Sequence, residues 1–120
     1  MLSKKILKKI PIIKRVYPSF MKIFYKNKKI KFKFFGLNLE GNFSEPMDKE
    51  IFLFNNYENL QIEFLINNIK KYNLKYFIDI GANSGIYSLI VRDKFHKIGI
   101  KSFEPVKKTI AKFKRNLKFN

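Results

Sequence analysis

The 120-residue chain contains no cysteine and a single histidine, His96. Without cysteine it can form neither a disulfide framework nor a thiolate metal site. His96 lies in a polar stretch with no partner histidine, so we interpret it as a solvated loop residue rather than a base or a ligand. The sequence therefore predicts no metal site, and its lack of cysteine agrees with a reducing, cytoplasmic location.

Acidic residues are scarce, with nine against 26 lysines and arginines and a net charge of +17. Residues 1–39 contain no acid and carry 12 of the 26 basic residues. This imbalance is typical of proteins that bind nucleic acid or an anionic membrane. However, the chain is also rich in Ile, Asn, Phe and Tyr, which share AT-rich codons with Lys. Charge alone therefore selects no function.

Long apolar runs are missing near the N-terminus, because lysines interrupt each one before a signal-peptide core or a membrane span is reached. Apolar residues nevertheless recur there at helical spacing. They are Ile6, Ile10, Ile13, Tyr17, Phe20 and Phe24. Pro11 and Pro18 interrupt this stripe and predict two short helices rather than one long helix.

The basic segment 1–39 has three interpretations. The favoured one packs the apolar stripe on the core and leaves the lysines solvated. The second places the amphipathic segment on an anionic membrane surface, which would make the protein membrane-peripheral. Binding to nucleic acid is the least favoured.

The length predicts one small domain, and the hydrophobic fraction of 46% is that of a globular chain. We expect three segments: a basic amphipathic segment at 1–27, a small antiparallel β element at 28–54, and the main α/β part at 55–120. Within 28–54 the apolar residues alternate on both sides of Gly36, which predicts two strands. Ile51 to Phe54 is predicted as a third short strand.

A helix is predicted from about Tyr57 to Lys71, with Asn55 or Asn56 as its cap. Its expected apolar face consists of Tyr57, Leu60, Phe64, Leu65 and Ile69.

The stretch from Lys75 to Ser88 organises the chain. Tyr76 to Ile80 is aromatic or β-branched apart from Asp79, which predicts a short parallel strand buried on both faces. Gly81 and Gly85 bracket the turn that follows, and glycine there lets a ligand approach the backbone closely. Apolar residues at helical spacing then predict a helix: Ile86, Leu89 and Ile90. Strand, glycine turn and helix together indicate a nucleotide-type fold.

A second strand is predicted from Ile98 to Phe103, and it ends at Glu104 and Pro105. A carboxylate at this position suits a ribose diol, because its two oxygens accept from both hydroxyls. Glu104 follows Gly85 by 19 positions, close to the spacing of about 20 residues expected of such a unit. Asp79 ends the first strand, at the edge where ligands bind in open α/β sheets.

Two known phosphate-binding patterns fit this sequence poorly. A dehydrogenase requires G-x-G-x-x-G, whose second glycine admits a pyrophosphate, and Asn83 stands at that position. The loss would be harmless for a nucleoside cofactor that has no pyrophosphate. The chain also lacks the G-x-x-x-x-G-K-[ST] loop of P-loop enzymes.

The pair Asp79-Ile-Gly-Ala-Asn-Ser-Gly85 and Ser102-Phe-Glu-Pro105 resembles the signature of FkbM-type methyltransferases, which use S-adenosylmethionine (SAM), a cofactor without a pyrophosphate. Asn116 and Asn120 resemble the paired asparagines that follow the second helix in that family. The resemblance covers residues 57–120 and implies a Rossmann-like class I methyltransferase sheet, with SAM as cofactor and O-methyl transfer to a small molecule or glycan. It implies cofactor contacts from Asp79, Gly81, Ala82, Asn83, Gly85 and Glu104.

A methyltransferase sheet of this class needs strands beyond the two predicted here. We therefore expect an incomplete chain that carries the cofactor half-site, and we assign no catalytic residue. Two alternatives stay open at this point. One is a non-catalytic truncated remnant, and the other is a binding module for a membrane surface or nucleic acid built on the basic segment.

Overall fold

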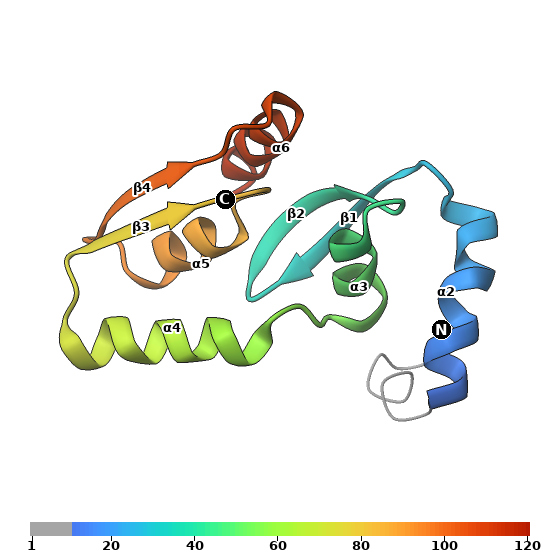
Figure 1. Ribbon diagram of the computed structural model, residues 1–120, viewed down its shortest axis with the longest axis horizontal. Coiled ribbons are helices and arrows are strands. Elements are labelled where there is room, and N and C mark those ends of the chain that lie inside the picture. The colour runs from blue at the N-terminus through green and yellow to red at the C-terminus, as the bar shows by residue number, and fades with distance from the viewer. Residues whose placement is uncertain (1–10) are drawn as a thin grey trace. The chain divides into compact units, whose positions relative to one another are not determined.

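The computed structural model describes residues 11–120 (Figure 1). These residues form an α/β structure with five helices and two two-stranded sheets, one antiparallel and one parallel. In chain order the elements are α2 (Pro11–Tyr25), β1 (Lys29–Phe34), β2 (Leu37–Asn42), α3 (Pro46–Phe54), α4 (Asn59–Tyr72), β3 (Tyr76–Ile80), α5 (Ile86–Lys94), β4 (Gly99–Phe103) and α6 (Lys107–Lys118).

The described residues form two compact units rather than the single predicted domain. The first unit contains residues 11–34 and 39–57, and the second contains residues 35–38 and 58–120. Residues 11–27 and most of the segment predicted at 28–54 thus fall in one unit, in which α3 packs on β1. The predicted third segment, 55–120, lies almost entirely in the second unit.

The core of the first unit follows the alternation of β1. Ile30, Phe32 and Phe34 are buried, whereas the lysines between them are exposed. Helix α3 covers these side chains with Ile51 and Phe54, which are 0% and 2% exposed. Each buried phenylalanine or isoleucine of this kind contributes about 1.5–3 kcal/mol of transfer free energy.

The predicted strand from Ile51 to Phe54 is wrong, because these residues end helix α3. A short apolar run fits a buried helix as well as a strand. Pro46 and Asp48, which precede the run, favour the helix. Pro46 stands in the first turn of α3, where no N–H is needed, and Asp48 lies at the positive N-terminal end of that helix.

Helix α2 is continuous through Pro18, so the predicted interruption at Pro18 is wrong. Pro11 is the first residue of α2, and the chain before it lies outside the described residues. Proline removes one hydrogen bond from the helix but does not end it here. Of the predicted stripe, Ile13 and Tyr17 are half-buried, whereas Phe20 and Phe24 are exposed. Ile6 and Ile10 lie outside the described residues. Between residues 11 and 120, no helix combines the length and the apolarity needed to cross a bilayer.

In the second unit, β3 and β4 pair in parallel, from Tyr76 opposite Gly99 to Ile80 opposite Phe103. Helices α4 and α5 pack on one face, where Ile69, Val91 and Ile98 form the centre of a core. The prediction that β3 is buried on both faces is wrong, since three of its side chains remain exposed. These are Tyr76, Ile78 and Ile80, at 79%, 59% and 84%.

The predicted helix at Tyr57 to Lys71 corresponds to α4, but its buried face and its cap differ from the prediction. Ile62 and Ile69 are buried, whereas Leu60 and Phe64 are 79% and 71% exposed. Glu58 occupies the N-cap in a left-handed conformation without a side-chain capping bond. The predicted capping residue Asn55 instead ends α3.

Candidate functional site

The candidate site lies where β3 and β4 end side by side. Asp79 pairs in register with Ser102, and Ile80 pairs with Phe103. Directly after β3, the backbone N–H groups of Gly81 and Ala82 both donate to the carbonyl oxygen of Phe103, each at 2.9 Å. The glycine turn is thus attached to the end of the neighbouring strand.

The Glu104 carboxylate forms the second attachment between the turn and β4. Its Oε2 accepts from the N–H of Asn83 and its Oε1 from the N–H of Val106, both at 2.9 Å. An ionised carboxylate offers about four acceptor positions, so two backbone donors leave room for two hydroxyl donors. Glu104 itself is half-buried.

The two glycines of the turn have different surroundings. Both adopt left-handed backbone angles, with φ of +79° at Gly81 and +83° at Gly85. A Cβ on Gly81 would meet no atom within 4 Å, so its backbone faces open space. A Cβ on Gly85 would overlap the ring of Phe113. Gly81 therefore leaves the approach to the turn open, whereas Gly85 allows α6 to pack against it.

Asp79 is engaged with α5 rather than with the turn. Its Oδ2 accepts from the hydroxyl of Ser88 at 2.5 Å, and Ser88 Oγ lies 2.7 Å from Ser102 Oγ. A hydroxyl carries one proton, so Ser102 donates to Ser88 while Ser88 donates to Asp79. The result is a three-residue chain that links β3, α5 and β4, with Ser88 only 3% exposed.

Sequence reasoning assigned no site role to Ser88 or Ser102. The sequence could have indicated Ser102 by its position, because Ser102 is the residue before the last in β4, as Asp79 is in β3. Among the predicted contacts, the structure brings Gly81, Asn83 and Glu104 together. Ala82 is buried, with 6% of its surface exposed, and it binds the end of β4 through its backbone N–H.

An open cleft of about 250 Å³ adjoins Glu104. Small-molecule pockets usually have about 300–1,000 Å³, so this cleft alone is at the small end. It combines a carboxylate and an ammonium group with apolar walls. Its lining residues are Ser102, Glu104, Ile110, Phe113, Lys114 and Leu117.

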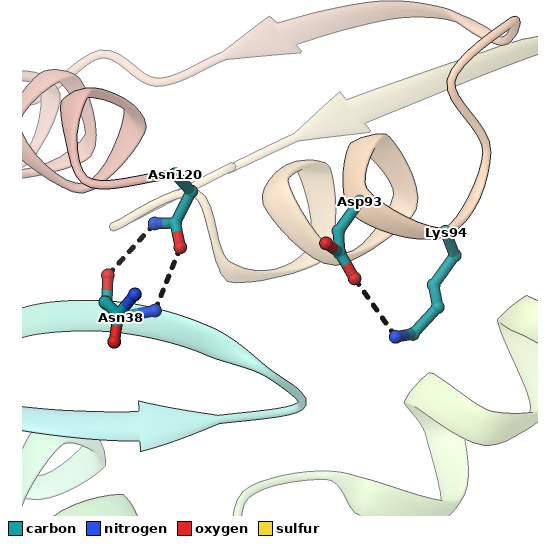
Figure 2. Close-up of polar contacts among 4 residues, drawn as sticks. All are labelled: Asn38, Asp93, Lys94 and Asn120. Atoms are coloured by element: carbon teal, nitrogen blue, oxygen red, sulfur yellow. Dashed lines mark hydrogen bonds and ion pairs between the residues drawn. The ribbon is translucent and has the colours of Figure 1, made fainter.

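Asn116 in α6 and Asn120 just after it both form hydrogen bonds with backbone groups. Asn116, 1% exposed, donates from Nδ2 to the carbonyl oxygen of Ser84 at 3.3 Å, which supports the glycine turn from behind. Asn120 brackets the backbone of Asn38, donating to its carbonyl and accepting from its N–H, both at 2.9 Å (Figure 2). Figure 2 also shows the exposed ion pair at the end of α5, in which Lys94 Nζ lies 3.0 Å from Asp93 Oδ2.

In residues 11–120, no group of three or more acidic, histidine or cysteine side chains is arranged to hold a metal ion. Comparisons with protein-family models, curated proteins and solved structures find no match to this chain.

Proposed function

We propose that residues 58–120 belong to the SAM-binding site of a Rossmann-like methyltransferase resembling the FkbM type, with β3 and β4 as its first two strands. The observation that supports this most directly is the position of Glu104. Two backbone N–H groups orient its carboxylate at the end of β4, beside the glycine turn. In that orientation both oxygens can accept from the two hydroxyls of a ribose.

The turn suits the rest of such a ligand. The open space at Gly81 admits a group to the backbone. Asp79 lies near the end of β3, and only its Oδ2 accepts from Ser88, so the carboxylate would suit the cationic amino group of SAM. The turn fits a dinucleotide less well, because Asn83 stands where the second glycine of a dehydrogenase fingerprint admits a pyrophosphate.

When bound, SAM supplies an electrophilic methyl group on a sulfonium. The residues of this chain would bind and orient it, which is the main protein contribution to such a transfer. By resemblance, the acceptor is a hydroxyl of a small molecule or glycan.

The test is calorimetric titration of SAM into the 120-residue chain and into the Glu104→Gln variant. The amide keeps one acceptor oxygen and loses the charge, so we expect affinity to fall about 10- to 100-fold. Glu63→Gln on α4 makes the same chemical change at an exposed position and should leave affinity unchanged. Circular dichroism checks that all three chains fold.

Glu104 also supports the turn, so a second ligand separates contact from support. A SAM analogue that lacks the ribose 2′-hydroxyl should bind the unaltered chain about tenfold more weakly than SAM. If Glu104 contacts the ribose, Glu104→Gln should bind the two ligands almost equally. A folded chain that binds neither ligand, or an unchanged preference in Glu104→Gln, would contradict the proposal.

A further inference from the structure

Helix α2 has a second apolar face that the first unit does not bury. One face packs inward, where the Tyr25 ring stacks on Phe43 with centroids 5.5 Å apart. The other carries five exposed apolar side chains, spaced by four, four, three and one residues, so that they share one side of the helix. They are Ile12, Val16, Phe20, Ile23 and Phe24, with exposures of 53–75%.

Basic side chains border this exposed face. Arg15, Lys22 and Lys26 follow one another by seven and four residues and are all exposed. Arg15 lies three residues after Ile12, and Lys26 lies three residues after Ile23, so each is one turn from the apolar face. Acidic residues are absent from positions 1–39, so no anion of this segment opposes them.

A cleft of about 390 Å³ lies beside α2 in the same unit. Lys22 and Lys26 line it together with Lys49 of α3, and Ser19 adds a hydroxyl group. Three ammonium groups and a hydroxyl around one hollow suit a phosphate group.

We propose that α2 lies in the surface of an anionic membrane. The exposed apolar face would enter the boundary between headgroups and acyl chains, and the lysine cleft would hold a phospholipid headgroup. A helix that combines an apolar face with a basic border and is too short to span binds in the plane of the membrane. Duplex nucleic acid matches the charge, but it offers no apolar phase for Ile12 and Ile23. This inference does not depend on the proposed cofactor site.

The first test is co-sedimentation of the chain with phosphatidylcholine vesicles that contain phosphatidylserine. We expect Ile12→Ser/Ile23→Ser to lower the partition coefficient by about tenfold or more, because both isoleucines would leave the lipid. The control is Leu60→Ser/Phe64→Ser on α4, which removes two equally exposed apolar side chains and should change little. Since all four residues are exposed, none of these changes should prevent folding.

The cleft is tested by Lys22→Gln/Lys26→Gln/Lys49→Gln. Each lysine near an anionic surface contributes about fivefold, so we expect a loss of about 100-fold. An equal loss of charge at three exposed lysines of α6, in Lys107→Gln/Lys108→Gln/Lys118→Gln, should cost much less. Losses of the same size in both triple variants would overturn the assignment of the cleft, because net charge alone would then explain binding.

Insertion of the apolar face is tested by fluorescence, since the chain has no tryptophan of its own. Tryptophan in Ile23→Trp should shift its emission to the blue on anionic vesicles and be quenched by brominated acyl chains. Tryptophan in Leu60→Trp should do neither. No shift in Ile23→Trp at saturating lipid would overturn the proposal. So would binding to duplex DNA that is lost on Lys22→Gln/Lys26→Gln/Lys49→Gln while vesicles are not bound.

Discussion

The carboxylate of Glu104 and the backbone N–H of Asn83 are joined by a hydrogen bond of 2.9 Å across 21 residues of sequence. This bond connects the glycine turn after β3 to the end of β4. Asn83 has a left-handed backbone with φ of +50°, which its short polar side chain tolerates. The carboxylate proposed to accept from the ribose therefore also holds the turn by a hydrogen bond, so the same side chain would bind both the turn and the proposed ligand.

The different surroundings of Gly81 and Gly85 predict different costs of the same substitution. Gly81→Ala should lower the free energy of unfolding by about 1–2 kcal/mol, the cost of a left-handed alanine. Gly85→Ala adds the overlap with Phe113, typically about 1–3 kcal/mol of overpacking, for a total of about 2–5 kcal/mol. Urea unfolding of the two variants measures the difference.

The Phe113 ring provides the control for this pair. Phe113→Leu combined with Gly85→Ala should recover part of the loss, because the smaller side chain makes room for the new Cβ. The same change should not improve Gly81→Ala. Equal costs for the two glycine variants would show that Phe113 does not limit the space at Gly85.

Asp48 should be the most costly acid to remove from the first unit. It is 1% exposed, and its Oδ2 accepts from the N–H of Asn42 at 2.7 Å. It also lies in the first turn of α3, near the positive end of that helix. We expect Asp48→Ala to lower the free energy of unfolding by about 1.5–3 kcal/mol, the usual contribution of a hydrogen bond to a charged group.

Glu50 of the same helix is the matched control for Asp48. Its carboxylate lies 3.7 Å from Lys14 Nζ, and both side chains are substantially exposed. Such pairs contribute about 0–1 kcal/mol, so Glu50→Ala should have little effect on urea unfolding. A cost for Glu50→Ala equal to that of Asp48→Ala would contradict the role of burial.

The sequence alone predicts the strand, glycine turn, helix and second strand from Tyr76 to Phe103 within one or two residues. This part is predictable because its signals are local. Glycines stand where the backbone turns, and β-branched or aromatic residues lie in the strands. The approach of Gly81, Asn83 and Glu104 to one another follows from the same pattern, since parallel strands end at a common edge.

The missed features depend on contacts made elsewhere in the chain. A run such as Ile51 to Phe54 is compatible with either helix or strand until its partners are known. The buried face of α4 is selected by α5, and Leu60 and Phe64 lie outside that contact. Nor does the sequence reveal that Asp48 is buried, because its partner is the backbone N–H of Asn42, which carries no residue-specific signal.

The hydroxyl chain from Ser102 through Ser88 to Asp79 should behave as one unit. Ser88→Ala removes both hydrogen bonds, and Ser102→Ala removes only the donor to Ser88. Once Ser88 is alanine, loss of the Ser102 hydroxyl should cost little more. We therefore expect the double variant to differ from the sum of the singles by at least about 0.5 kcal/mol. Urea unfolding of the four chains measures this coupling, and Ser88→Ala with Ser19→Ala, at an exposed serine of α2, gives the additive control. Additivity of Ser88→Ala and Ser102→Ala would mean that the two hydroxyls act independently on Asp79 and β4.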